Sequence, residues 1–464
     1  MSTVAERLAG FTSTLSADAL PPEVALAAKL HVLDTLGCGL AAFAVGVASG
    51  ARDAMLEPGT TGPATAIGAP HGLPSTDAAF YNAVTCHALD FDDTHTGSIA
   101  HVSVAIVPAA LAAAEAEGAT GPELLAAIVA GNEVVTRLGM AAGPLFHNVG
   151  FHPTAILGVF GATASAARIM RLDAATTRQA LGIAGSLAAG ILENLADGST
   201  TTRLHPGFAA RSGILAARLA AHGETGPATV IEGRFGVYNA YLRRGDLDID
   251  GQLSDLGERW ETPNIAYKPY PACHFLHAAV DSAAEATAGG IDVDEIEEIV
   301  AVGPADVVRI VLVPLADTHA PRSEYDAKFS LPYSVASYLV HGKVDVMTYV
   351  GDAIRDPRVL ELTQRVRYET KDFPTFGKAF PAGVRVTMRD GSVLEAELPH
   401  QRGGEENPLT GDEVRAKYAG NAALALGATD AAALEEAVLG VEELPALDVF
   451  AVLSRAAALE AATA

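Results

Sequence analysis

Six long apolar segments, separated from one another by Gly or Pro, occupy most of the first half of this chain. Each is long enough for several helical turns, and its apolar residues cover a wide face, as in helices buried within a helical domain. Ala and Gly are frequent, which favours helices that approach one another closely. The pattern predicts a large all-α domain with helices over residues 23–43, 104–117, 122–138, 154–170, 175–192 and 208–222.

The pattern changes near Trp260. A helix is expected over residues 273–288 and a strand over 296–302. Residues 384–398 alternate apolar and polar on either side of Asp390 and Gly391, which is a strong hairpin signal. These features predict a smaller α+β domain, after which helical sequence resumes to the C-terminus.

Charge and cysteine content exclude several classes of function. The formal net charge of -25 over 464 residues argues against nucleic acid binding, which requires a basic surface. The three cysteines form no CxxC pair, and the N-terminus has no basic segment followed by an apolar run, so we expect a reducing, cytoplasmic location. The most apolar stretch, near residues 35–49, is shorter than the roughly 20 residues that a membrane span needs. We expect neither a nucleic acid partner nor a membrane.

Charged and titratable groups gather in residues 88–101. Asp90, Asp92, Asp93, His95 and His101 place three carboxylates and two imidazoles within fourteen positions of an Ala-rich chain. Such groups serve in proton transfer or as metal ligands, and the two interpretations lead to different enzymes. Asp92 and Asp93 are equally compatible with capping a helix.

The remaining histidines favour acid–base chemistry over a metal. His274 and His277, at i and i+3, would need aspartates from residues 90–93 to complete a site, and no HExxH or EF-hand spacing occurs. The chain also lacks GxGxxG, a Walker loop and GxSxG. Cys273 is either a nucleophile or a small buried thiol. Lys268, followed by Pro, lies in extended or turn backbone, where it would neutralise a substrate carboxylate or act as a base.

Seven short segments resemble, in order, the motifs of the MmgE/PrpD family, which includes 2-methylcitrate dehydratase, cis-aconitate decarboxylase and iminodisuccinate epimerase. The match covers nearly the whole chain. The segments are residues 33–37 (LDTLG), 87–94 (HALDFDDT), 101–103 with 108–111 (HVS, PAAL), 150–154 (GFHPT), 204–207 (LHPG), 267–271 (YKPYP) and 407–410 (NPLT).

The resemblance implies a mostly α fold and a homodimer without a metal or other cofactor. The large all-helical domain would comprise residues 1–266 and 401–464, and the α+β lid domain residues 267–400. The active site would lie in the cleft between the domains. The resemblance places the following residues at that site: Asp90, Thr94, His101, His152 and Lys268.

Two positions depart from the family pattern. Thr202 stands where many members have a lysine, so a cation expected to contact substrate is missing unless Arg203 replaces it. Arg favours bidentate binding of carboxylates and does not act as a base at neutral pH. Cys273 stands where decarboxylases of the family carry a histidine, with His274 next to it.

We therefore predict a cofactor-independent lyase of the 2-methylcitrate dehydratase or cis-aconitate decarboxylase type, which acts on a small di- or tricarboxylate by proton transfer alpha to a carboxylate. An iminodisuccinate-type epimerase and a non-catalytic helical binding protein on the same fold are the alternatives. His101 and Lys268 would transfer protons and Asp90 would orient an imidazole. The predicted substrate-binding residues are Thr94, His152, Arg203, His205, Cys273 and His277.

Overall fold

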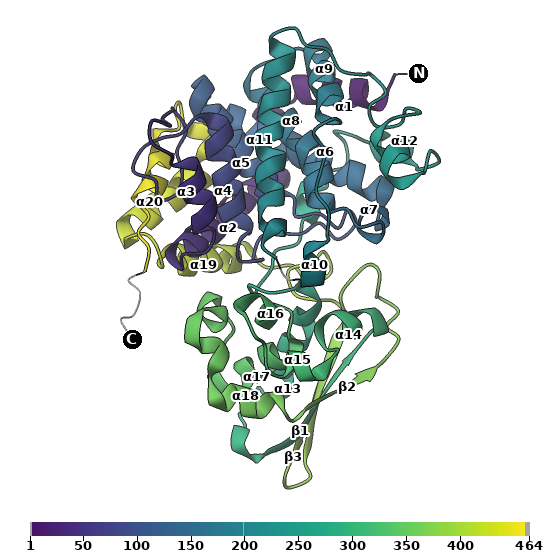
Figure 1. Cartoon of the computed structure of the whole chain (residues 1–464), viewed down its shortest axis with the longest axis vertical. Helices are drawn as coiled ribbons and strands as arrows, with labels where there is room; N and C mark the ends of the chain where they lie inside the picture. The colour runs from purple at the N-terminus through teal and green to yellow at the C-terminus, as the bar shows by residue number, and fades with distance from the viewer. Residues whose placement is uncertain (1, 198, 460–464) are drawn as a thin grey trace. The chain divides into compact units, whose positions relative to one another are not determined.

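The computed structural model describes residues 2–197 and 199–459, and the chain divides into two compact units (Figure 1). Unit 1 consists of Met1–Ala88, Asp92–Ile265 and Thr410–Ala464, and unit 2 of Leu89–Phe91 and Ala266–Leu409. Residues 89–91 and 401–409 thus group with unit 2, although the sequence-based boundaries gave them to the helical domain. Hydrogen bonds explain this grouping, since Lys328 Nζ donates to the Leu89 carbonyl and Tyr267 N donates to the Gly403 carbonyl.

Unit 1 is built from helices, among which α11 packs against α4, α8 and α9, and α6 packs against α8 (Figure 1). The C-terminal helices α19 and α20 pack against α2. The α-helices described in unit 1 are α1 (Val4–Thr14), α2 (Pro22–Ala44), α3 (Ser49–Met55), α4 (Ser75–His87), α5 (Ser103–Glu117), α6 (Gly121–Ala142), α7 (Leu145–Asn148), α8 (Pro153–Ile169), α9 (Ala174–Ala184), α10 (Asn194–Asp197), α11 (Thr201–Ala221), α12 (Ile249–Leu253), α19 (Gly411–Ala422) and α20 (Ala428–Leu439).

Small residues set the spacing of the central helices. A Cβ atom built on Gly161 of α8 would lie 2.7 Å from the Gly131 carbonyl oxygen of α6 and 2.4 Å from a methyl carbon of Val135. Such distances are far inside van der Waals contact, so the two helices meet backbone to backbone at this point. This close approach explains why the predicted all-α domain needs so much Gly and Ala.

Two helix boundaries differ from the prediction. Helix α9 ends at Ala184 rather than at residue 192, and the Phe151–Ile191 bridge then pairs the following segment with the chain before α8. Gly190, at φ +144°, has a backbone conformation that no helix contains. Helix α11 begins at Thr201 rather than at residue 208, because it continues through Pro206 instead of starting after it. His205 consequently lies inside a helix and not at a helix end.

Unit 2 is a four-stranded mixed sheet with helices. Strand order is β2-β1-β3-β4, with β1 parallel to β2 and antiparallel to β3. The predicted hairpin is β3–β4, which turns at Gly391 with φ +83°. A 3₁₀ turn (His274–Leu276) replaces the start of the helix predicted from residue 273. The strands and helices described are β1 (Ile296–Gly303), β2 (Val366–Thr370), β3 (Ala382–Met388), β4 (Val393–Leu398), α13 (His277–Ala286), α14 (Ala305–Val311), α15 (Leu315–Thr318), α16 (Glu324–Lys328), α17 (Leu331–His341) and α18 (Pro357–Thr363).

Among the described residues, α2 and α6 are long and apolar enough to cross a membrane by length and composition. In the most apolar 18-residue stretch of each helix, 78% of α2 and 89% of α6 is buried inside the protein, as in core helices. Helix α2 extends back to Pro22, so it is longer than the apolar stretch of residues 35–49 that was compared with a membrane span. Length and composition alone give only weak evidence for a membrane span.

Candidate active site

The candidate site of unit 1 is built around the connection between α4 and α5. Helix α4 ends at His87, and α5 begins at Ser103. Between them, a tight turn joins His95 to Ala100, whose carbonyl accepts the His95 N–H at 2.9 Å. Ile99 in this turn has φ +53°, a strained conformation for a β-branched residue, and such strain concentrates at functional sites.

Asp92 is a fully buried carboxylate that accepts hydrogen bonds from two imidazoles. His87 Nδ1 lies 2.9 Å from its Oδ2, and His101 Nδ1 lies 3.3 Å from the same oxygen. Burial acts to raise the pKa of Asp92, but the charges and hydrogen bonds of His87 and His101 outweigh burial and hold it well below its usual range. Asp92 therefore stays ionised and anchors both rings. The alternative that it caps a helix is wrong, because its side chain binds imidazoles instead.

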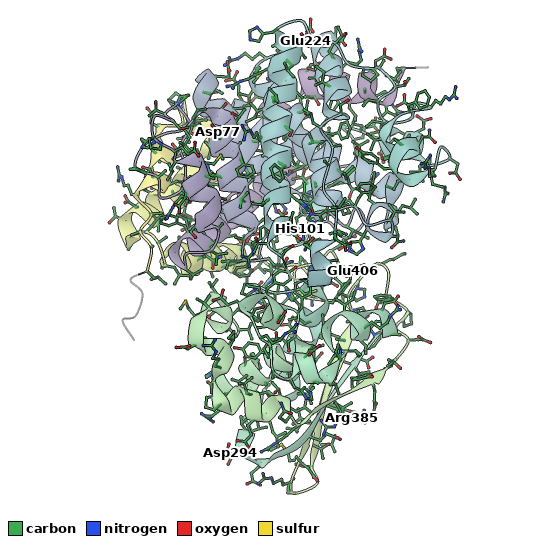
Figure 2. The ribbon with its side chains drawn as sticks, in the orientation of Figure 1. Asp77, His101, Glu224, Asp294, Arg385 and Glu406 are labelled. Atoms are coloured by element: carbon green, nitrogen blue, oxygen red, sulfur yellow. The ribbon has the colours of Figure 1, made fainter. Side chains whose placement is uncertain are left out.

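The contacts of His101 fix which of its nitrogens carries a proton. Its Nδ1 lies 3.0 Å from the backbone carbonyl oxygen of Asp93, 3.3 Å from Asp92 Oδ2 and 3.2 Å from Thr94 Oγ1. A carbonyl and a carboxylate can only accept, so Nδ1 is the donor. The lone pair of the neutral ring is then on Nε2, which is the arrangement of a general base. Figure 2 labels His101.

His152 and His205 form a second imidazole pair. His152 precedes the first residue of α8, His205 lies on α11, and their Nδ1 atoms are 3.0 Å apart. Burial lowers the pKa of His152 well below its usual range and that of His205 to about 4, and the neighbouring imidazoles add to both shifts. Both rings are therefore neutral at pH 7, one donating to the other. Ring centroids place His152 6.0 Å from His87 and 6.1 Å from His101.

Asp93 connects the site to helices α2 and α5. Its Oδ1 accepts the N–H of Ser103 at the start of α5, and its Oδ2 lies 2.8 Å from His31 Nδ1 of α2. His31 Nε2 lies 3.2 Å from the Thr262 carbonyl oxygen. His31 and Asp93 are thus a fully buried imidazole–carboxylate pair next to the carbonyl that His101 contacts.

A second buried pair lies near Asp93, between α2 and α19. Lys417 Nζ is 2.6 Å from Asp34 Oδ1. Burial raises the pKa of Asp34 to about 6 even though Lys417 opposes the shift. The core of unit 1 behind the site therefore contains paired charges rather than only apolar side chains.

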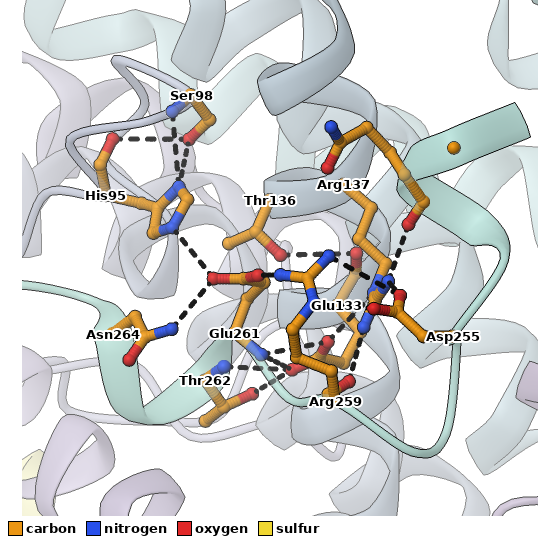
Figure 3. A network of polar contacts seen from close by, with 12 residues as sticks. His95, Ser98, Glu133, Thr136, Arg137, Asp255, Arg259, Glu261, Thr262 and Asn264 are labelled. Atoms are coloured by element: carbon orange, nitrogen blue, oxygen red, sulfur yellow. Dashed lines mark hydrogen bonds and ion pairs between the residues drawn. The ribbon is translucent and has the colours of Figure 1, made fainter. Parts of the chain in front are cut away.

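His95 belongs to a different network, drawn in Figure 3. Its Nδ1 contacts Ser98 Oγ at 3.0 Å, and its Nε2 lies 3.5 Å from Glu261 Oε2. The network continues to Glu133, which accepts the backbone N–H groups of Glu261 and Thr262 at 2.9 and 2.8 Å. His95 therefore supports the turn that precedes His101.

Arg137 joins the same network. It is fully buried on α6, with Nε 3.2 Å from Glu133 Oε2 and an Nη 2.6 Å from Asp255 Oδ1. Burial raises the pKa of Glu133, whereas hydrogen bonds from Arg259 and Arg137 lower the pKa of Asp255 to about 2. These contacts hold residues 252–262 against α6.

Two predicted catalytic residues meet inside unit 2. Lys268 Nζ donates to Asp90 Oδ1 at 2.6 Å and to the Asp90 carbonyl oxygen at 3.0 Å. The Lys268 side chain is only 2% exposed, and Asp90 has the uncommon φ of +55°. The structure therefore pairs Asp90 with the lysine, and its role as orienter of an imidazole stays a prediction.

The other predicted residues of unit 2 lie close to one another. The Cys273 N–H donates to the Lys328 carbonyl at 3.0 Å, and burial raises the pKa of its thiol to about 12, which argues against a nucleophilic thiolate. His277 Nε2 donates to the Ala272 carbonyl at 3.1 Å, and its ring centroid is 4.8 Å from that of His274. Their contact with a substrate stays a prediction.

The start of α11 contains the position that departs from the family pattern. Thr202 lies three residues before His205 and so shares its face of the helix, whereas Arg203, two residues before, projects from another. Among the residues that the structure describes, the buried Thr202 hydroxyl has no hydrogen-bond partner. Replacement of the missing lysine by Arg203 stays a prediction.

A pocket of about 430 Å³ elsewhere in unit 1 is lined by α9 and residues 227–241, including Arg234, Phe235 and Tyr241. The imidazoles described above do not line it. Its lining contains a single charged side chain and no pair of groups that titrate near neutral pH for proton transfer, so we assign the chemistry to the imidazoles described above.

Sequence reasoning undervalued His87, Asp92 and His31. The sequence singled out His87 only within the HALDFDDT segment, and it left proton transfer, metal binding and helix capping open for Asp92. The only signal in the sequence was the spacing of five between His87 and Asp92 across the end of a helix. His31, Asp93 and Asp34 gave no signal of contact, because they meet only when α2 packs against the connection before α5.

Comparison with known proteins identifies the same family in both parts of the chain. The MmgE/PrpD N-terminal domain matches residues 6–250, and the MmgE/PrpD C-terminal domain matches residues 270–443. The chain is 29% identical to the cis-aconitate decarboxylase of Mus musculus over 98% of this chain and 93% of that protein. The chain is also 29% identical to the cis-aconitate decarboxylase of Homo sapiens, over 96% of this chain and 93% of that protein. The chain is 26% identical to the cis-aconitate decarboxylase of Aspergillus terreus, over 96% of this chain and 94% of that protein.

Proposed function

Because the chain belongs to the MmgE/PrpD family of enzymes, we propose that it is a lyase that releases carbon dioxide from a small tricarboxylate such as cis-aconitate without a cofactor. The three relatives named above, all cis-aconitate decarboxylases, support this choice of reaction. The observation that carries the proposal is the fixed ring of His101. Asp92 and the Asp93 carbonyl hold its Nδ1–H, so the proton that moves is on Nε2.

The proposed decarboxylation takes up one proton from the enzyme. The bond between a substrate carbon and one carboxylate carbon breaks, and its electron pair passes into the adjacent double bond and carboxylate. Carbon dioxide leaves, and His101 Nε2–H gives its proton to carbon and is reprotonated from water. The ionised Asp92 stabilises the imidazolium before this transfer. General acid catalysis of this kind contributes about 10²–10⁴-fold to the rate.

Enolate-like charge on the remaining carboxylates needs hydrogen-bond donors. The neutral pair of His152 and His205 and the hydroxyl of Thr94, 3.2 Å from His101 Nδ1, are the donors that we assign in unit 1. Lys268 is the cation that we assign to a substrate carboxylate, with Asp90 holding its ammonium group. Arg203, Cys273 and His277 complete the proposed binding residues.

An epimerase of the iminodisuccinate type is the second candidate, and Thr202 favours it. A hydroxyl at this position supplies no positive charge to stabilise the enolate-like charge that decarboxylation leaves on the substrate, or a departing hydroxide. Epimerisation removes a proton from one face of a carbon and returns a proton to the opposite face, for which we assign His101 Nε2 as the base and Lys268 as the acid. The two candidates share the base and differ in whether a carbon–carbon bond breaks.

We also propose a homodimer in a reducing cytoplasm. Phe208, Leu215 and Leu219 of α11 are 48%, 41% and 36% exposed. Their spacing of seven and four places them along one face of the helix, where a second copy would cover them. Cys38, Cys86 and Cys273 are free and buried, which supports a reducing location.

Incubation in deuterated water with cis-aconitate, 2-methylcitrate, citrate and iminodisuccinate, followed by NMR, tests the function. We expect loss of carbon dioxide from cis-aconitate, with one deuterium in the product. Deuterium uptake without net conversion would replace the decarboxylase by the epimerase, and loss of water would indicate a dehydratase. Reaction with none of the four would overturn the substrate class and favour the non-catalytic binding protein.

A further inference from the structure

Three imidazoles of unit 1 converge from separate segments. His87 ends α4, His101 lies two residues before α5, and His152 precedes α8. One nitrogen from each lies within 4.8 Å of the nitrogens from the other two. Zinc–nitrogen bonds of about 2.0–2.1 Å in a tetrahedral site place ligand nitrogens roughly 3.4 Å apart, so the three rings must move closer together to share one ion.

Their hydrogen bonds already resemble those around a metal. Histidines that bind metals almost always donate their other N–H to a carboxylate, a carbonyl or water, which fixes the tautomer and the ring. Asp92 accepts from Nδ1 of both His87 and His101, so a metal ion would bind Nε2 of each ring once that nitrogen has released any proton it carries. His152 Nδ1 is held by His205 at 3.0 Å. All three rings are oriented before any ion binds.

We propose that His87, His101 and His152 bind one divalent transition-metal ion of the Zn²⁺ or Co²⁺ type, and that the bound ion inhibits the enzyme. Three neutral imidazole ligands suit these ions, whereas Mg²⁺ and Ca²⁺ select oxygen ligands. The buried charge of Asp92 compensates part of the charge of the ion. Three protein ligands leave a fourth position for water or a carboxylate.

Inhibition follows from the atom that the ion would occupy, and this part rests on the proposed function. An ion on His101 Nε2 takes the lone pair that would carry the proton, so the imidazole can neither donate to carbon nor accept from it. The ion would therefore act against turnover and not as a cofactor. This site differs from the one considered from the sequence, which used His274 and His277.

Titration of the metal-free full-length protein with Co²⁺ tests the site independently of activity. Tetrahedral Co²⁺ absorbs strongly in the visible range, and we expect one equivalent to bind and Zn²⁺ to displace it. His87→Gln and His152→Ala should each weaken binding at least 100-fold, and Asp92→Asn about 10–100-fold, as expected of a residue that orients ligands. The exposed His222, changed to Gln, is the matched control and should leave binding unaltered.

Circular dichroism shows whether each variant is folded, and Asp92→Asn tests the site without removing a ligand. Absence of a tetrahedral spectrum in the wild type would overturn the proposal, as would unchanged binding in folded His87→Gln and His152→Ala. Zn²⁺ should also stop turnover, and a chelator should restore it. If Co²⁺ binds as described but no substrate reacts, the metal site stands and the proposed function fails.

Discussion

At the residue scale, the site depends on carboxylates that orient imidazoles. Asp92 contacts His87 and His101, and Asp93 contacts His31; all of these side chains except the partly exposed His101 are buried. A buried ion that loses its partner is costly, because neither water nor another charge replaces the lost interaction. These pairs therefore bear on both the stability and the activity of the protein.

Replacement of His31 by Leu leaves the Asp93 carboxylate buried without its imidazole partner. We expect the free energy of unfolding, measured by urea denaturation, to fall by about 3–5 kcal/mol. His71→Ala is the control, since His71 is exposed and contacts only the Thr60 carbonyl at 2.9 Å among the described residues; its effect should stay within about 0.5 kcal/mol. Equal stability of His31→Leu and the wild type would show that the pair contributes nothing.

Lys268→Met keeps the length of the side chain and removes its charge. If Lys268 binds a substrate carboxylate, KM should rise about 10–100-fold, as expected for loss of a hydrogen bond between charged groups. Steady-state kinetics on the reacting tricarboxylate measures this. The half-exposed Lys371, paired with Glu397 at 2.5 Å, gives the control Lys371→Met with unchanged KM. An unchanged KM for Lys268→Met would remove Lys268 from the substrate-binding residues.

At the element scale, ion pairs of the buried Arg137 hold a segment without long helices against α6. Residues 252–262 lie against α6 through Arg137, Glu133 and Asp255 (Figure 3). The same segment carries Glu261, which contacts His95 in the turn before His101. Loss of this fastening should therefore loosen the turn as well as the segment.

The Asp255 pair gives a pH-dependent prediction. Hydrogen bonds from Arg259 and Arg137 lower the pKa of Asp255 from 3.8 to about 2, so its stabilisation is present above pH 4 and is lost as pH falls toward 2. The difference in unfolding free energy between wild type and Asp255→Asn should be constant from pH 5 to 7 and shrink below pH 4. A difference that does not vary between pH 5 and 2 would refute this role.

At the scale of the whole molecule, the proposed homodimer can be tested on the exposed apolar face of α11. If two copies meet there, Leu215→Glu should convert a dimer into a monomer of 47.6 kDa in analytical ultracentrifugation. Leu26→Glu, at a 49% exposed position on α2, should leave the dimer intact. A monomeric wild type, or a dimer that persists in Leu215→Glu, would contradict the proposed interface.

Local patterns predicted the helices well where apolar residues run unbroken, as in α2, α5, α6 and α8. They failed at α11, because Pro206 is accommodated inside the helix, and at β2, where only Val366 is buried and no alternation exists. The family and His101 followed from ordered motifs, and comparison confirms the family. The joint anchoring of His87 and His101 by Asp92 depends on packing, and no local pattern contains it.

Release of carbon dioxide from cis-aconitate by wild type and His101→Gln tests the central claim most directly. Gln keeps a polar side chain near the size of the imidazole but cannot carry the proton. The account predicts turnover by the wild type and by the His222→Gln control, and a loss of about 10²–10⁴-fold in kcat for folded His101→Gln. Equal kcat in wild type and His101→Gln would contradict it.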